Sequence, residues 1–158
     1  MKKIGFLISE KENEKRRAIV FEDLKRISNK EKIYIQKGYF NNFGYTDDEV
    51  VKIGVNVCEK DEIIKKCDVI IDPKVGDSDD LKKMKNKIIF GWIHATQNFD
   101  ITQNLIDNKI TAYAWEKMFN DNRHTFYINN QIAGQAAILH SSLCIGDSYK
   151  GKKVAVLG

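Results

Sequence analysis

Two short apolar runs in the chain each end in a side chain that can exchange protons. Asp68–Asp72 is followed by Pro73 and Lys74, and Ile88–Ile93 is followed by His94. Open α/β sheets bind their ligands just outside the carboxyl ends of the strands, so both side chains would lie where a substrate binds. A desolvated lysine can polarise a carbonyl group, and an imidazole can carry a proton near neutral pH. We therefore predict Lys74 and His94 as catalytic residues, although a solvated loop lysine and a structural histidine remain open alternatives.

A third candidate lies in the charged segment Glu12–Val20, between the first apolar run and the first expected helix. This segment contains Arg16 and Arg17. An arginine fork binds a carboxylate through two parallel hydrogen bonds, so we predict Arg16 as the substrate-binding arginine. A charged surface cluster is the alternative interpretation, and the sequence leaves open which of the two arginines faces the site.

These residues need a scaffold that brings the ends of strands together. Short β-rich runs alternate with amphipathic charged segments along the chain, which is the pattern of βαβ units. The pattern predicts an α/β fold: a doubly wound, mostly parallel sheet with flanking helices, of the Rossmann or flavodoxin-like kind. Two nearly all-apolar runs, Asp68–Asp72 and Ile88–Ile93, should be central strands covered on both faces. The other strands are expected at Ile4–Ile8, Lys32–Gln36, Val55–Cys58 and Ile110–Trp115, and helices at Val20–Ser28, Asp47–Ile53, Asp61–Lys66, Asp79–Lys85 and Ile101–Asp107.

The last part of the chain has a different pattern. From about Asn130 the apolar spacing predicts one long helix, and the polar stretch Asp147–Lys153 that follows is typical of a linker. Val154–Gly158 then has the composition of a strand that enters a dinucleotide-binding unit and reaches the first glycine of its loop. One glycine alone is a weak signal for such a loop.

Composition narrows the class of partner. The 158 residues carry a net charge of +4 from 26 basic and 22 acidic residues. These charges are interspersed, so no nucleic-acid footprint stands out and we expect small-molecule partners. The first apolar run, Ile4–Ile8, is too short for a signal peptide, and no later run approaches the length of a membrane span. The three cysteines are widely spaced in no metal-ligand pattern, which indicates reduced thiols, no metal site and a cytoplasmic protein.

Five segments of the chain carry a family resemblance: Glu12–Ala18, Asp68–Lys74, Phe90–His94, Ala114–Met118 and Asn129–Ala136. Taken together they resemble the N-terminal portion of the alanine dehydrogenase/pyridine nucleotide transhydrogenase superfamily. Two of them, Phe90–His94 and Ala114–Met118, resemble in particular its branch of N5-(carboxyethyl)ornithine synthases. The resemblance runs through the whole chain in register.

The resemblance implies that the chain is the N-terminal portion of a two-domain oxidoreductase. Residues 1–128 would form the catalytic, substrate-binding domain, residues 129–146 the connecting helix, and residues 147–158 a linker and the first strand of a truncated NAD(P)-binding domain. The cofactor of the whole enzyme would be NADP(H) or NAD, and we expect none bound to this fragment. A homo-oligomer is also expected.

The resemblance also implies roles for single residues. By position, Arg16 matches the family's carboxylate-binding arginine, Lys74 the lysine that contacts the keto-acid carbonyl, and His94 the acid/base histidine. Asn130 falls where the family touches the nicotinamide end of the cofactor, and Gly158 where its glycine loop begins.

The implied reaction is the reductive condensation of pyruvate with the side-chain amine of ornithine, and the fragment alone should be inactive. Two alternatives stay open. One is an amino-acid dehydrogenase, either an alanine dehydrogenase that uses ammonia or a saccharopine-dehydrogenase-like enzyme. The other is a non-catalytic module that binds a keto acid or a protein partner.

Overall fold

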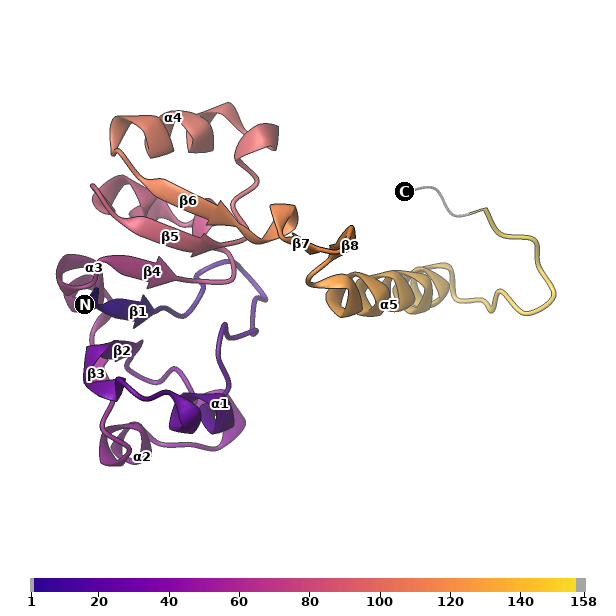
Figure 1. Cartoon of the computed structure of the whole chain (residues 1–158). Helices are drawn as coiled ribbons and strands as arrows, with labels where there is room; N and C mark the ends of the chain where they lie inside the picture. The colour runs from indigo at the N-terminus through magenta and orange to yellow at the C-terminus, as the bar shows by residue number, and fades with distance from the viewer. Residues whose placement is uncertain (1, 156–158) are drawn as a thin grey trace. The chain divides into compact units, whose positions relative to one another are not determined.

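A parallel six-stranded sheet forms the centre of the first part of the chain. The computed structural model describes residues 2–155 and divides the chain into two compact units, Met1–Lys117 and Met118–Gly158. In the first unit every strand pairs parallel to its neighbours, in the order β3-β2-β1-β4-β5-β6 (Figure 1). The strands are β1 Ile4–Phe6, β2 Ile33–Gln36, β3 Asn56–Cys58, β4 Val69–Ile71, β5 Ile88–Gly91 and β6 Thr111–Ala114.

Helices cover both faces of this sheet, which confirms the predicted doubly wound α/β fold. The helices α1 (Phe21–Arg26) and α2 (Asp47–Lys52) pack over one face, while α3 (Lys60–Lys66) and α4 (Phe99–Asp107) pack over the other. Each face has its own core, since successive strand residues point to opposite sides of a sheet. Buried residues of the first core are Phe6, Phe21, Leu24, Ile33, Ile35, Tyr39, Phe40, Val50 and Val55. Those of the second are Leu7, Ile63, Ile64, Cys67, Ile70, Val75, Leu81, Met84, Ile89, Ile93 and Ile101.

Strand positions agree with the prediction. β4 lies between β1 and β5, and β5 lies between β4 and β6, so both predicted central strands are internal. The helix α2 begins with a complete capping box, in which the Thr46 side chain accepts from the Glu49 N–H and Glu49 reaches back to the Thr46 N–H.

One predicted helix is a different kind of helix. The segment expected as a helix over Asp79–Lys85 is the 3-10 helix η4, Asp79–Lys83. Residues three apart eclipse one another in a 3-10 helix. Leu81 within η4 and Met84, the residue that follows it, are both buried and pack against the second core.

The second unit contains a short hairpin and one helix. The strands β7 (Phe119–Asn120) and β8 (Arg123–His124) pair antiparallel. The helix α5 (Tyr127–Ile145) ends at Gly146, whose φ of 65° suits a glycine. The helix had been expected over 129–146. Among the described residues, no helix is long and apolar enough to cross a membrane.

The strand expected at Val154–Gly158 is only partly covered by the structure. Val154 and Ala155 lie in no strand, and residues 156–158, including Gly158, lie outside the described residues. The predicted division at residues 128/129 and 146/147 stays a prediction.

Candidate active site

The direction of winding reverses between β1 and β4. From β1 the chain moves to β2 and β3 on one side and then returns to β4 on the other, so β1 and β4 flank the point where the winding reverses. Loops that leave two such strands diverge, and ligands of open α/β sheets bind in the opening at the carboxyl ends. The loop after β1 contains Arg16, and the loop after β4 contains Lys74.

The loops after β4 and β5 are held together by backbone contacts beyond the strands themselves. The Trp92 N–H donates to the Pro73 carbonyl at 3.1 Å, and the Gly76 N–H donates to the Trp92 carbonyl at 3.2 Å. A Cβ on Gly76 would lie 2.0 Å from the Ile93 carbonyl oxygen, so only glycine allows this approach. Because β4 and β5 are neighbouring parallel strands, Lys74 and His94 leave the sheet at the same edge.

Lys74 emerges from a turn that a buried carboxylate organises. Asp72 Oδ1 accepts the Lys74 backbone N–H at 2.8 Å, and Pro73 between them restricts the backbone. The side chain of Lys11, from the loop after β1, forms an ion pair with Asp77 at 2.8 Å. The loop after β1 is therefore tied to the loop that contains Lys74.

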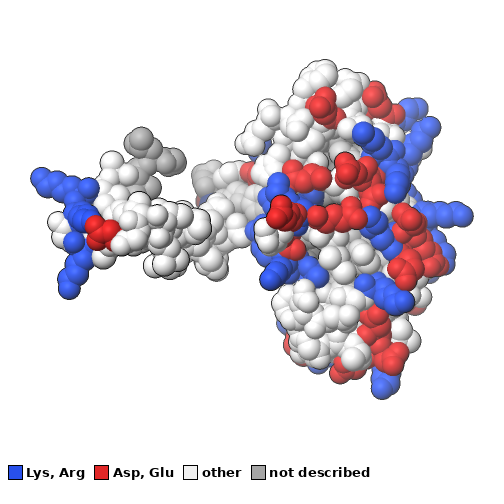
Figure 2. All heavy atoms as spheres, turned by 180° about the vertical axis from the view of Figure 1, so that it is seen from behind, with Lys and Arg blue, Asp and Glu red and all other residues white. Residues whose placement is uncertain are grey.

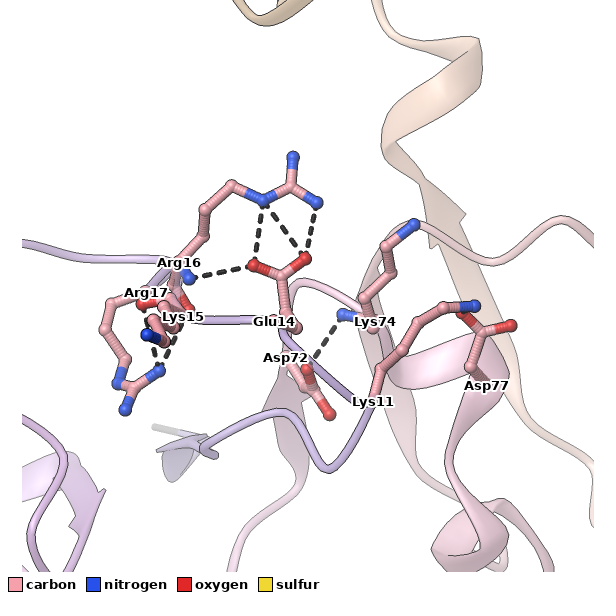
Figure 3. A network of polar contacts seen from close by, with 8 residues as sticks. All are labelled: Lys11, Glu14, Lys15, Arg16, Arg17, Asp72, Lys74 and Asp77. Carbon is pink, nitrogen blue, oxygen red and sulfur yellow. Dashed lines mark hydrogen bonds and ion pairs between the residues drawn. The ribbon is translucent and has the colours of Figure 1, made fainter. Parts of the chain in front are cut away.

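Arg16 is paired with a carboxylate of its own loop. Its Nε lies 2.9 Å and 3.1 Å from the two Glu14 carboxylate oxygens, its Nη2 lies 2.5 Å from Glu14 Oε2, and its backbone N–H also donates to Glu14. Figure 3 shows the Glu14 carboxylate between Arg16 and Lys74. The hydrogen bond from Arg16 lowers the pKa of Glu14 despite partial burial, and the Lys74 charge adds to this effect. The same pairing raises the pKa of Arg16.

Arg17 has a different environment, which bears on the question of which arginine faces the site. Its Nε donates to the Tyr39 carbonyl at 2.8 Å, and its guanidinium lies 5.2 Å from the centre of the Tyr39 ring. The Tyr39 hydroxyl in turn accepts the Ala18 N–H, and burial raises the pKa of Tyr39 to about 12. Arg17 thus anchors its loop to the core beside β2, and Arg16 is the arginine near Lys74.

Asp72 is a titratable group of this edge that the sequence analysis did not single out. Its side chain is buried, and burial raises its pKa to about 6, against a usual value of 3.8. The Lys74 N–H and the nearby Ser9 hydroxyl lower this pKa, while the charges of Glu14 and Glu10 raise it further. An aspartate that ends an apolar strand directly before proline and lysine was the available signal.

His94 adopts an unusual backbone conformation that a neighbouring strand end holds. Its φ of 58° and ψ of 23° are left-handed. The Glu116 carboxylate, just after β6, accepts the backbone N–H of Ile93 at 3.1 Å and of His94 at 2.6 Å. Burial works to raise the pKa of Glu116, but backbone N–H donors, including these two, bring it below its usual value. Glu116 is the second residue that sequence reasoning missed, since its partners are backbone atoms of another loop.

The His94 ring is placed by packing. It stacks on Trp92, with 6.3 Å between ring centres and an angle of 11° between the planes. Its Nδ1 is buried and has no hydrogen-bond partner within residues 2–155. Buried polar atoms without a partner are rare and call for an explanation, such as a bound substrate or water.

One of the two predicted cofactor residues belongs to the second unit, and the other lies outside the described residues. Asn130 is an exposed residue of α5 in the second unit, and Gly158 is beyond the residues that the structure describes. In the first unit, the chain has no glycine between Gly5 and Gly38, and the first turn of the short α1 contains Glu22 and Asp23. A dinucleotide phosphate needs close-packed glycines and a helix N-terminus without negative charge. The β1 loop therefore does not fit a dinucleotide cofactor.

A hollow lies at the opposite edge of the sheet, where the strands begin. It has a volume of about 540 Å³ and is wide open to solvent. Three lysines line it, but Lys83 is paired with Asp80 and Lys87 donates to the Cys67 carbonyl. Its residues are Asp61, Ile64, Lys65, Lys83 and Lys87. Since it lies where the strands begin, it shares no residue with the edge that contains Lys74 and His94.

Fold and site together define a class: a doubly wound α/β domain of Rossmann strand order, with charged side chains instead of a glycine-rich loop where the winding reverses. The chain belongs to the family of alanine dehydrogenase/PNT N-terminal domains, whose sequence model matches residues 7–134.

Similar proteins agree with this assignment. Over 99% of this chain and 54% of the relative, the sequence is 29% identical to an N(5)-(carboxyethyl)ornithine synthase of Clostridium botulinum. An L-alanine dehydrogenase structure matches with a TM-score of 0.62 and 17% identity, over 77% of this chain and 34% of that one. A Sinorhizobium meliloti transhydrogenase structure matches with a TM-score of 0.61 and 17% identity, over 74% and 36%. The chain thus spans about half the length of the curated relative, and the two structures share its fold.

Proposed function

We propose that the chain is the substrate-binding part of an NAD(P)-dependent oxidoreductase that condenses pyruvate reductively with the side-chain amine of ornithine. The observation that carries the proposal is the exit of Lys74 and His94 from neighbouring strands at one edge, beside the loop that contains Arg16. The similarity to an N(5)-(carboxyethyl)ornithine synthase over nearly the whole chain supports the choice of substrates.

In this mechanism each of the three side chains, Arg16, Lys74 and His94, has a separate role. Arg16 holds the carboxylate of pyruvate, and Lys74 donates a hydrogen bond to its carbonyl oxygen, which makes the carbonyl carbon more electrophilic. The amine nitrogen adds to that carbon and gives a carbinolamine. Two protons pass from nitrogen to oxygen: the first turns the carbonyl oxygen into the hydroxyl of the carbinolamine. His94 takes the second proton from nitrogen and gives it to that hydroxyl, so that water leaves and an imine forms.

Reduction of the imine needs a hydride, which a reduced nicotinamide, NADPH or NADH, would supply. The residues of the β1 loop do not fit that cofactor, so its binding would depend on a glycine-rich loop that begins at Gly158. Asn130 is proposed as a contact near the nicotinamide. The free thiols of Cys58, Cys67 and Cys144 favour a reducing, cytoplasmic location, which stays a prediction.

The assignment is tested on the full-length natural protein, with oxidation of NADPH or NADH followed in the presence of pyruvate and one amine at a time. We expect turnover with ornithine, and mass spectrometry should identify the carboxyethyl product. Turnover with ammonium alone would indicate an alanine-dehydrogenase reaction, and turnover with lysine a saccharopine-dehydrogenase-like one.

Two substitutions test the catalytic pair. Lys74→Met and His94→Gln should each lower kcat/KM by about 100-fold or more, because each removes a group that polarises a bond or moves a proton. Lys65→Met is the matched control, since Lys65 lies at the opposite edge of the sheet. Equal activity of the Lys74 and Lys65 variants would contradict the proposed role of Lys74.

A further inference from the structure

The most informative contact outside the proposed chemistry is the ion pair between Glu14 and Arg16. Glu14 is almost buried, with 7% of its side chain exposed, whereas 46% of the Arg16 side chain is exposed. The carboxylate accepts from both Nε and Nη2, the edge through which an arginine binds a carboxylate with two parallel hydrogen bonds. One of the two bidentate edges of the Arg16 guanidinium is therefore already occupied by a carboxylate.

Glu14 is held firmly in this place. Its backbone N–H donates to the Lys11 carbonyl at 3.0 Å, which closes a tight turn, and Asn13 within the turn has a φ of 63°. Lys11 is itself paired with Asp77 after β4. The turn thus fixes the base of the Glu14 side chain, so a displaced carboxylate would have to move by rotation of the side-chain torsions alone.

Charge makes a second carboxylate on the same edge unfavourable. Two further acidic groups, Asp72 and Glu10, lie near Glu14. The negative charges of Glu14 and Glu10 both raise the pKa of Asp72. Like charges repel one another, so a substrate carboxylate would bind most favourably if Glu14 moved away as the substrate bound.

We propose that Glu14 is an internal competitor for the substrate carboxylate: it occupies Arg16 in the empty site, and a 2-oxo acid binds by displacing it. This rests on the proposed function for the identity of the 2-oxo acid, but the displacement itself concerns any small carboxylate. Glu14 would thereby set the affinity of the site without taking part in bond making or breaking.

The test is Glu14→Gln in the full-length natural protein, with Glu12→Gln as the control, since Glu12 is an exposed acid of the same loop. We expect Glu14→Gln to lower the KM for pyruvate about three- to tenfold with kcat unchanged, because a neutral amide competes less well for the guanidinium. Glu12→Gln should change neither constant. A KM that rises or stays the same would overturn the proposal, and a raised KM would identify Glu14 as a brace that positions Arg16.

Direct binding separates this inference from the proposed function. The side-chain Nε–H signal of Arg16 is followed by NMR while pyruvate, and then acetate, is added to the wild type and to Glu14→Gln. Tighter carboxylate binding to the variant, without turnover of pyruvate in either protein, would support the displacement and refute the proposed reaction. Turnover of pyruvate with equal affinity in both would refute the displacement alone, and no carboxylate binding to either protein would refute both.

Discussion

At the scale of single residues, the site is a small group of opposite charges around one buried carboxyl. Arg16 and Lys74 are the cations, and Glu14 and Asp72 are the acids that lie with them. The cations were expected from the sequence because lysine and arginine near strand ends suggest a carbonyl and a carboxylate. The acids were not, because their effect depends on burial and on contacts with backbone atoms.

The raised pKa of Asp72 predicts a stability that depends on pH. Its pKa is about 6 in the folded chain and near 3.8 when unfolded, so the folded state binds more protons between these values. Ionisation of Asp72 therefore lowers the free energy of unfolding as the pH rises from 3.8 to about 6. Asp72→Asn keeps an acceptor for the Lys74 N–H and removes the charge. We expect it to raise the free energy of unfolding by about 1–3 kcal/mol at pH 7.5 and by little at pH 4, as measured by urea denaturation.

A control for Asp72→Asn is Asp68→Asn at the other end of β4. The Asp68 carboxylate accepts the Lys3 N–H, which lowers its pKa, so its ionised form favours the folded state. Asp68→Asn should therefore lose stability at pH 7.5 and at pH 4 alike, because the Asp68 carboxylate of the folded chain stays ionised until the pH falls below 3.8. An equal gain for Asp72→Asn at both pH values would mean that Asp72 is not strained by its burial.

At the scale of elements, the pairing of β4 with β5 decides whether the catalytic groups meet. Gly91 ends β5, and a Cβ there would lie 2.0 Å from the Asp72 carbonyl oxygen and 3.0 Å from Val75. Because that oxygen belongs to the backbone, it cannot move without separating the two strands. The close approach is therefore a requirement of the site.

Gly91→Ala should accordingly destabilise the chain by about 1–3 kcal/mol or more. Gly134→Ala is the matched control, since nothing lies within 4 Å of a Cβ at this position of α5, and alanine should gain about 0.5–1 kcal/mol in a helix. Circular dichroism during chemical denaturation measures both changes. Similar stability of the two variants would contradict the tight approach of β4 and β5.

Much of this secondary structure can be predicted from local sequence patterns. Apolar runs separated by capped amphipathic segments were enough to predict six strands, their parallel arrangement and the central place of β4 and β5. Other features depend on contacts across the fold. The 3-10 form of η4 accompanies burial of Leu81 and Met84 in a core built from several elements, and the left-handed backbone of His94 is held by Glu116, which is 22 residues away in the chain.

At the scale of the whole molecule, the two units have different surfaces. Figure 2 shows basic and acidic residues intermixed over the first unit, whereas the helix of the second is almost entirely uncharged. The sequence of α5 contains no lysine, arginine, aspartate or glutamate, and the structure buries none of its residues. Exposed apolar helices of this kind are sites of association.

We expect the 158-residue chain to self-associate through this helix. Leu139 and Leu143 are 68% and 79% exposed and one turn apart. Leu139→Glu with Leu143→Lys keeps the net charge and adds a favourable helical pair, so it should reduce association without unfolding the helix. Ile106→Glu on α4 is the control. A wild-type monomer by light scattering over a wide concentration range would contradict this expectation.

Binding of a keto acid at the carboxyl ends of β1, β4 and β5 can be tested by a residue-resolved NMR titration of the full-length natural protein with pyruvate. We expect saturable shifts at Glu14, Arg16, Lys74 and His94, and their loss in Lys74→Met. Shifts that cluster instead at Lys65 and Lys87, in the hollow at the opposite edge, would contradict it.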